Sequence, residues 1–166
     1  MRLLTRSHAM HYEPDSLFFT QLSQFQRLYS RSLAARLAPL DVHPGYLGVL
    51  HYLWQGDGVT QKTLFELMPV EQATLSNTLK RMERDRLIER SPDPGDKRHH
   101  IISLTQKGAS AKAPVIQAIG DLRAAVNAGL TVTDRRYFRR IMRQMTEALE
   151  ADQADPLFLL LDEVDG

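Results

Sequence analysis

The 166-residue sequence predicts a mainly α-helical fold with one small β-hairpin. Most of the chain repeats its apolar residues every three to four positions, which is typical of amphipathic helices. Residues 87–90 and 99–104 are instead short β-type runs, and the turn between them is rich in Pro, Gly and Asp. The predicted hairpin directly follows a predicted helix, and its turn carries the cations Lys97 and Arg98. The order of these elements is the first indication of what the chain contacts.

The composition is that of an ordinary globular chain. Hydrophobic residues make up 43% and charged residues 25%, and the net charge of +1 does not indicate a polyanion-binding surface over the whole molecule. The absence of cysteine excludes a disulfide scaffold and thiol chemistry. No stretch resembles a signal peptide or a membrane span, so we expect a cytoplasmic protein.

The charges are unevenly distributed near the end of the sequence. Five arginines crowd residues 135–143, and no Lys or Arg follows them. Seven acidic residues come after these arginines: Glu147, Glu150, Asp152, Asp155, Asp162, Glu163 and Asp165. Two interpretations stay open here: a solvated helix face followed by an acidic surface segment, or a nucleic-acid role for the arginines.

Two helices are predicted in the first third of the chain. Residues 15–38 read as one amphipathic helix that Pro39 ends, with a stripe formed by Phe18, Leu22, Phe25, Tyr29 and Leu33. Pro44 suits the first turn of the next helix. Apolar residues cover most of the circumference of that second helix, which predicts that it is buried.

A helix-turn-helix pattern follows. Thr60 can cap a short helix that runs to about Leu67, and a longer helix lies in VEQATLSNTLKRMERDRL, with Leu75, Leu79 and Met82 facing inward. Its other faces carry amide, hydroxyl and cationic side chains, which can bind base edges and phosphates in DNA. A solvated amphipathic helix would give the same pattern.

The hairpin makes the DNA-binding interpretation stronger. A helix-turn-helix followed directly by two strands and a basic turn is a winged helix, in which a cation at the hairpin tip can enter a minor groove. The fold class is therefore mainly α with a small β-hairpin wing. We expect DNA contacts from Lys62, Gln72, Thr74, Ser76, Asn77, Lys80, Lys97 and Arg98.

The segment SPDPGDKRHHIISLTQKG resembles the wing of the MarR family (multiple antibiotic resistance regulators), which reads D-x-R and then L-T-x-x-G. Here these positions are residues 96–98 and 104–108. ATLSNTLKRMERDRLIER similarly resembles the family's recognition helix, and LDVHPGYLGVLHYL its second helix. The resemblance covers most of residues 15–150. Ala73 and Asn77 depart from the family's frequent serine and arginine, so the operator sequence cannot be transferred from relatives.

The resemblance implies a homodimeric transcriptional regulator, expected to be a repressor, that binds a pseudo-palindromic double-stranded operator. We accordingly expect an N-terminal dimerisation helix at 12–40, a winged helix-turn-helix domain at 41–108, C-terminal dimerisation helices at 109–152 and an acidic, apolar tail at 153–166. A capping box of Thr131 and Asp134 begins the last long helix. From the residues alone, the same amphipathic helices could close a monomeric core.

The resemblance also implies release from DNA by a small effector, such as a phenolic or aromatic carboxylate. Because the chain has no cysteine, it cannot sense peroxides through a thiol, and a small-molecule ligand is the favoured effector. Arg27 and Arg31 could form a carboxylate clamp, with His43 and Tyr46 as an aromatic wall. The competing interpretation is that these arginines are surface charges and that the two aromatic residues pack at a helix start.

Other classes of function have little support in the sequence. No catalytic, nucleotide-binding or metalloprotease motif occurs, so we expect no enzyme activity, cofactor or catalytic residue. His99 and His100 are neighbours in a predicted strand and would point to opposite faces, which disfavours a metal site built from that pair. A winged helix that binds another protein, or a metal-responsive regulator, remains an alternative. The apolar run 157–161 is expected to dock on the helical stalk or on a partner subunit.

Overall fold

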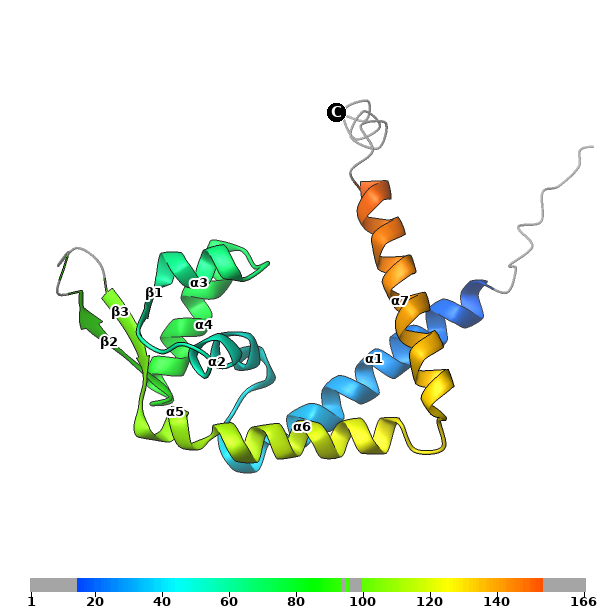
Figure 1. Ribbon diagram of the computed structural model, residues 1–166, viewed down its shortest axis with the longest axis horizontal. Helices are drawn as coiled ribbons and strands as arrows, with labels where there is room; N and C mark the ends of the chain where they lie inside the picture. Colours follow the sequence, from blue (N-terminus) through cyan, green and yellow to red (C-terminus); the bar gives the residue numbers. More distant parts are fainter. Residues whose placement is uncertain (1–14, 94, 96–99, 154–166) are drawn as a thin grey trace, which may run out of the picture. The chain divides into compact units, whose positions relative to one another are not determined.

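The structure is a computed structural model that describes residues 15–93, 95 and 100–153. Its elements are α1 (Asp15–Leu37), the 3-10 turns η1 (Ala38–Leu40) and η2 (Pro44–Tyr46), α2 (Leu47–Leu53), β1 (Val59–Thr60), α3 (Gln61–Leu67), α4 (Gln72–Arg84), β2 (Ile88–Pro92), β3 (His100–Leu104), α5 (Gln106–Ser110), α6 (Lys112–Val126) and α7 (Val132–Gln153). The chain divides into two compact units between Leu122 and Arg123. The predicted fold class, mainly helical with a small β element, is confirmed (Figure 1).

The junction between α1 and α2 follows from its prolines and one left-handed residue. Helix α1 ends at Leu37, and Pro39 lies in the 3-10 turn that follows. Asp41 has a φ of 54°, a left-handed conformation that reverses the chain direction. His43 then caps η2 by accepting a hydrogen bond from the Gly45 N–H, with Pro44 in the first turn. This junction carries residues of the pocket described below.

Helices α3 and α4 form the predicted helix-turn-helix. The Thr60 hydroxyl accepts a hydrogen bond from the Thr63 N–H at 3.1 Å, which caps α3 as expected. Helix α4 buries the predicted stripe of Leu75, Leu79 and Met82, each no more than 1% exposed. Burial of one α4 face leaves its opposite, polar face at the surface.

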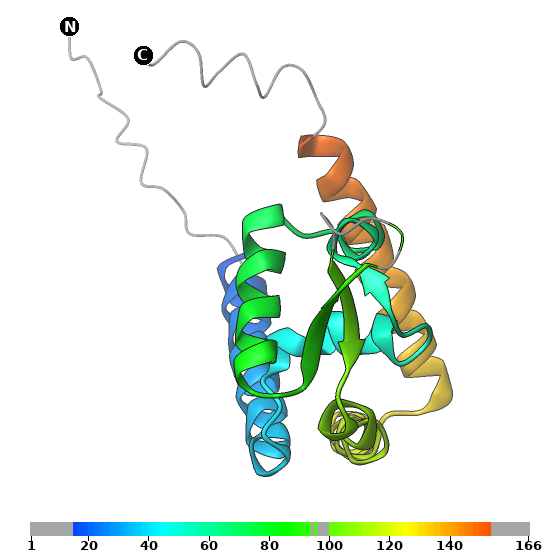
Figure 2. The ribbon, with the colours of Figure 1, turned by 90° about the vertical axis from the view of Figure 1, so that its left-hand side faces the viewer.

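A three-stranded antiparallel sheet completes the winged helix, with β3 between β1 and β2. Ile102 of β3 pairs with Val59 on one side and with Arg90 on the other. The hairpin of β2 and β3 was predicted, whereas the two-residue β1 was not. Figure 2 turns the hairpin toward the viewer, with α4 beside it.

The core of the first unit draws on nearly every element around the sheet. Leu50, Leu64, Leu79 and Ile102 are at most 1% exposed. The same cluster includes Leu37 at the end of α1, and Ala111 and Val115 at the junction of α5 and α6. The winged helix therefore shares its core with both flanking helices.

The second unit contains α7, whose start matches the sequence prediction. The Thr131 N–H donates to Asp134 Oδ2 at 2.8 Å, and the Asp134 N–H donates to the Thr131 hydroxyl at 3.1 Å, which is a reciprocal capping box. The Thr131 hydroxyl also donates to Asp134 Oδ2 at 2.7 Å, and this bond, followed by that from the Thr131 N–H, lowers the pKa of Asp134. Within the described ranges, every helix is too short or too polar to cross a bilayer.

Candidate nucleic-acid interface and effector pocket

The outward face of α4 carries a row of exposed residues that includes an amide and two cations. Ala73, Asn77, Lys80 and Arg84 are spaced by four, three and four residues, so they share one face of the helix. All four are exposed, and they lie opposite the buried stripe that contains Leu79. An amide and two cations along one exposed helix face suit base edges and phosphates.

The first turn of α4 adds further groups. Gln72 and Thr74 are exposed, and Ser76 is half-buried. Glu71 occupies the N-cap position without a side-chain cap, so backbone N–H groups at the start of α4 can donate hydrogen bonds to an anion. On α3, Lys62 is exposed, and its ammonium lies 3.8 Å from Glu66 Oε1.

The hairpin is anchored to α4 at its base. Arg90 Nε of β2 lies 3.2 Å from Glu83 Oε2 of α4, which joins the wing to the helix-turn-helix. In the turn, the Asp93 side chain accepts a hydrogen bond from the Gly95 N–H at 2.8 Å. The predicted wing contacts Lys97 and Arg98 lie outside the described residues.

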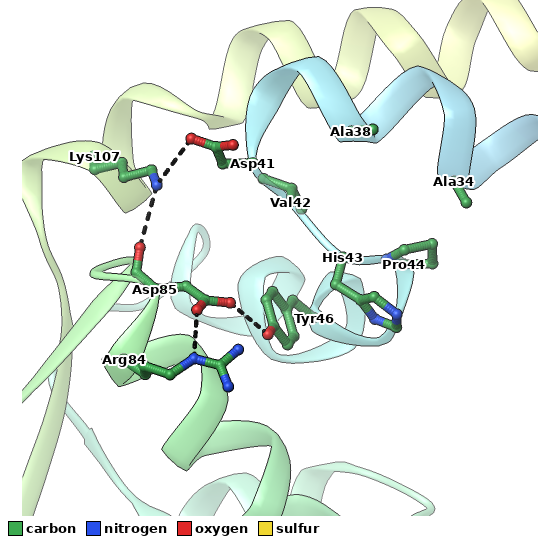
Figure 3. A pocket seen from close by; sticks show the side chains of 10 residues that line it. All are labelled: Ala34, Ala38, Asp41, Val42, His43, Pro44, Tyr46, Arg84, Asp85 and Lys107. Atoms are coloured by element: carbon green, nitrogen blue, oxygen red, sulfur yellow. Dashed lines mark hydrogen bonds and ion pairs between the residues drawn. The ribbon is translucent and has the colours of Figure 1, made fainter.

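A pocket of about 570 Å³ opens between the end of α1, the start of η2 and the end of α4 (Figure 3). Two of the predicted effector residues, His43 and Tyr46, line it, and their rings are tilted with centroids 5.5 Å apart. Ala34, Ala38, Asp41, Val42, Pro44, Arg84, Asp85 and Lys107 complete the lining. A pocket of this volume falls in the ordinary range for small-molecule sites.

Asp85 joins the pocket wall to the end of α4. The Tyr46 hydroxyl donates to Asp85 Oδ2 at 2.7 Å, and Arg84 Nε donates to Asp85 Oδ1 at 2.9 Å. The hydrogen bond from Arg84, followed by that from Tyr46, holds the pKa of Asp85 below its ordinary value. Burial raises the pKa of Tyr46, and its bond to Asp85 adds to this. Both groups therefore keep their neutral-pH forms, with phenol donating to carboxylate.

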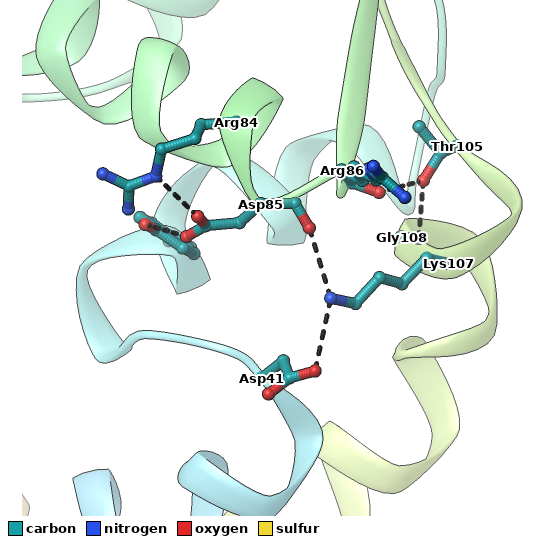
Figure 4. Close-up of polar contacts among 8 residues, drawn as sticks. Asp41, Arg84, Asp85, Arg86, Thr105, Lys107 and Gly108 are labelled. Atoms are coloured by element: carbon teal, nitrogen blue, oxygen red, sulfur yellow. Dashed lines mark hydrogen bonds and ion pairs between the residues drawn. The ribbon is translucent and has the colours of Figure 1, made fainter.

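Lys107 of α5 ties together the end of α1 and the end of α4 (Figure 4). Its ammonium donates to the Asp85 carbonyl at 3.2 Å and lies 3.4 Å from Asp41 Oδ2. Next to it, the Thr105 hydroxyl donates to the Arg86 carbonyl at 2.6 Å and accepts from the Gly108 N–H at 3.1 Å. The L-T-x-x-G positions thus brace the end of α4.

Arg27 and Arg31 are not among the lining residues. They share one face of α1 with Ala34, at spacings of four and three residues, and both are exposed on turns before the pocket. The pocket obtains its cations from Arg84 and Lys107 instead. Sequence reasoning missed these two, because only the fold brings α4 and α5 against the end of α1.

In the part of the chain that the structure describes, no three His, Asp or Glu side chains lie close enough together to hold a metal ion. The ring of His51, for example, contacts the side chain of Gln55, with 2.7 Å between the ring Nε2 and the amide nitrogen.

Comparison with known proteins agrees with this geometry. Residues 45–100, which include most of η2, all of α2, the helix-turn-helix and strand β2, match the MarR family. The chain belongs to the MarR family. The resemblance first noted in the wing motif is confirmed.

Two MarR-type relatives have curated names. The organic hydroperoxide resistance transcriptional regulator of Bacillus subtilis is 34% identical over 56% of this chain and 66% of its own length. The HTH-type transcriptional repressor NicR of Pseudomonas putida is 33% identical over 50% of this chain and 55% of its own length. The chain thus matches between about half and two thirds of the length of these relatives. Both names are those of regulators and not of enzymes, in line with the expectation from the sequence.

Solved MarR structures share the fold. A mutant MarR from E. coli complexed with operator DNA has a TM-score of 0.66 at 24% identity, covering 80% of this chain and 96% of that one. The organohalide-sensing regulator RdhR, bound to 2,4-dichlorophenol, has a TM-score of 0.74 at 19% identity, covering 89% of each chain. At these identities the likeness establishes the fold.

Proposed function

We propose that this MarR-family chain is a cytoplasmic, homodimeric transcriptional repressor that binds a pseudo-palindromic operator. The observation that carries the proposal is the exposed polar face of α4, held above a fully buried apolar stripe and followed by a hairpin. In a winged helix this face enters the major groove while the hairpin tip approaches the adjacent minor groove. The operator-bound MarR structure is a similar protein and supports this proposal.

Within this interface we assign base reading and backbone contact to different residues. Asn77 carries an amide that can bond bidentately to adenine, and Gln72 and Thr74 start the same helix. Lys80 and Lys62 are better suited to phosphates, because an ammonium is a point charge without a fixed donor geometry. Lys97 and Arg98 retain the role in the minor groove that the sequence predicts.

We expect Asn77→Ala to lose sequence discrimination while retaining non-specific binding. Removing one good bidentate contact costs about 1–3 kcal/mol, and only on the correct base pair. Titration against operator and scrambled DNA at several salt concentrations measures this, after a footprint on the DNA flanking the gene has located the operator. The salt dependence of Asn77→Ala should equal that of the wild type, because no cation is removed.

Two further variants are compared with Asn77→Ala: a control outside the interface and a variant of the wing. Gln144→Ala removes an exposed amide from α7 instead of from α4, and should leave both affinities unchanged. Arg98→Ala should weaken operator and scrambled DNA together and reduce the log-log salt slope by roughly one per lost contact, doubled in a dimer. Equal discrimination by Asn77→Ala and wild type would contradict the reading role. If no DNA fragment binds at all, a winged helix that binds another protein becomes the better account.

We further propose that a small aromatic acid occupies the pocket at the end of α1 and lowers operator affinity. The Gly45 N–H donates to His43 Nδ1 at 3.0 Å, so the neutral ring carries its proton on Nε2 and can donate it to a ligand. Within the described residues, Arg84 hydrogen-bonds through Nε alone, which leaves its terminal nitrogens for a carboxylate. We therefore give Arg84 the clamping role that the sequence assigned to Arg27 and Arg31.

The pocket is coupled to DNA reading through the end of α4. A ligand carboxylate that hydrogen-bonds to Arg84 competes with Asp85 for this side chain. The second carboxylate oxygen of Asp85 accepts a hydrogen bond from Tyr46. Because Arg84 shares its helix face with Asn77 and Lys80, a shift at this end changes the orientation of the reading face. The regulator RdhR, a similar fold, binds a chlorinated phenol, which supports an aromatic effector.

A thermal-shift screen of aromatic acids, followed by titration of variants, tests the effector site. Arg84→Gln should weaken ligand binding roughly 10- to 100-fold, since a charged hydrogen bond contributes about 1.5–3 kcal/mol. His43→Ala should weaken it less, and Arg31→Ala should not change it. Operator DNA must weaken ligand binding by the same factor by which ligand weakens DNA binding. Unchanged ligand affinity in both Arg84→Gln and His43→Ala would exclude this pocket without affecting the DNA-binding proposal.

A further inference from the structure

Helix α7 of the second unit carries a basic face. Its four exposed arginines fall within about two turns of the helix: Arg136, Arg139, Arg140 and Arg143. Arg136, Arg140 and Arg143 are spaced by four and three residues, so they share one side of the helix, and Arg139 lies one turn before Arg143. The guanidinium of Arg140 lies 5.1 Å from the centre of the Tyr137 ring, which is a cation–π contact. These four arginines are the basic face of α7.

The apolar side chains of α7 lie on the opposite side of the helix. A stripe with spacings of three, four and four residues consists of Phe138, Ile141, Met145 and Leu149. Phe138 and Arg140 are two residues apart, which is about 200° around the axis at 3.6 residues per turn. Contact through the apolar stripe, with a second copy of the chain or with residues 157–161, which lie outside the described residues, therefore leaves the basic face exposed.

The described residues neutralise the charge of the basic face only in part. Arg143 Nε lies 3.7 Å from Glu147 Oε1, and both side chains are more than half exposed. An exposed ion pair of this kind contributes little, so Arg143 can exchange Glu147 for another anion. Among residues 15–93, 95 and 100–153, Arg136, Arg139 and Arg140 form no ion pair. The basic face is therefore a concentrated positive charge that a polyanion can neutralise.

We propose that the basic face of α7 binds the phosphates of double-stranded DNA without reading its sequence. Arg136 and Arg143 are about 10 Å apart along the helix axis, and one strand of B-DNA presents about three phosphates over that length. A guanidinium can donate two parallel hydrogen bonds to one phosphate, and all four cations of the face are arginines. Phosphate contacts fix the position of the DNA and carry no sequence information.

DNA fits the basic face better than a membrane does. A helix that lies on a bilayer inserts its apolar side among the lipids, and in the proposed dimer that side of α7 contacts the second copy of the chain. The chain also belongs to a family of transcriptional regulators, so DNA is the polyanion that it meets. The choice of DNA over a membrane thus rests on the proposed dimer, whereas the contact itself does not depend on operator reading by α4.

A salt titration of scrambled duplex DNA tests the inference in the full-length protein. The triple variant Arg136→Gln, Arg140→Gln, Arg143→Gln removes three cations and retains residues of high helix propensity. The plot of log affinity against log salt concentration should become less steep by roughly three for each protomer that contacts the duplex, because each lost phosphate contact releases about one counterion fewer. The matched control replaces the same three arginines by lysine. Lysine keeps the charge, so the slope of this control should equal that of the wild type.

Operator reading is measured in the same titration, with operator and scrambled duplexes of equal length. The glutamine variant should keep the wild-type ratio of the two affinities, whereas Asn77→Ala should lower that ratio and keep the slope, so the two proposals fail separately. A wild-type slope in the glutamine variant would overturn the inference. An equal loss of slope in the lysine variant would also overturn it, since charge would then not be the cause. If wild-type protein binds vesicles of anionic lipid and the glutamine variant does not, with duplex binding equal in both, the basic face belongs to a membrane instead.

Discussion

Gly108→Ala is expected to destabilise the first unit by about 3 kcal/mol, the upper end of the usual cost of overpacking. A Cβ at this position would overlap the carbonyl oxygen of Leu87 and lie 3.0 Å from its carbonyl carbon. That carbonyl cannot easily move, because it accepts the Thr105 N–H at 3.1 Å and Leu87 is fully buried. Helix α5 must shift instead, which also strains the bond between Trp54 and the Gly108 carbonyl. Urea unfolding followed by circular dichroism measures the change.

Gly120→Ala is the matched control. Gly120 lies within α6, and a Cβ there meets no atom within 4 Å. Alanine should stabilise the helix by about 0.5–1 kcal/mol, because it restricts the unfolded chain without a clash. If both substitutions changed stability by the same amount, the close approach of α5 to Leu87 would not be the reason for glycine at 108.

Aspartates on the apolar stripe of α1 should convert the proposed dimer to monomers. The exposed apolar side chains of this helix are Leu17, Phe18, Phe19, Leu22, Phe25, Leu28 and Tyr29. Contiguous exposed apolar surface of this kind marks an interface, and carboxylates within it would have to be desolvated. A monomer engages one half-site only, so Leu22→Asp with Phe25→Asp should lower operator affinity about 10²- to 10⁴-fold.

The control adds the same charge to the opposite face of α1. Thr20 is exposed there, and Thr20→Asp should leave dimerisation and operator binding close to wild type, whereas Leu22→Asp alone, which adds one charge to the stripe, should weaken both. Analytical ultracentrifugation and DNA titration report on the two effects separately. A dimer of undiminished affinity in the Leu22 and Phe25 variant would assign dimerisation to another surface.

The elements that could be predicted from the sequence are those whose causes are local. The Thr60 cap, the Thr131 capping box and the buried α4 stripe each depend on residues within a few positions of one another, and all three are observed. The hairpin could also be predicted from the sequence, since its turn and strands are contiguous in the chain. The β1 strand was missed because two residues show no periodicity, and only the pairing of Val59 with Ile102 makes them a strand.

The pocket could be predicted only in part, because some of its residues are far apart in the sequence. His43 and Tyr46 lie at a helix start that the sequence marks with Pro44, so an aromatic wall was foreseeable. Their polar partner Asp85 is 39 residues further along the chain, and its contact with Tyr46 exists only after α4 packs against η2. The sequence therefore suggested Arg27 and Arg31 of α1, which is nearby in sequence, whereas the residue that lines the pocket, and to which we propose to give the clamping role, is Arg84.

The bond from Trp54 to the Gly108 carbonyl gives this protein an optical reporter. Trp54 is the single tryptophan of the chain, and it is half-buried in the first unit, with its indole N–H 3.0 Å from that carbonyl. Its fluorescence therefore follows melting of the winged helix, whereas the 22 residues of α7 contribute ellipticity but no tryptophan emission. Separate midpoints for the two signals would resolve unfolding of the two units without any label.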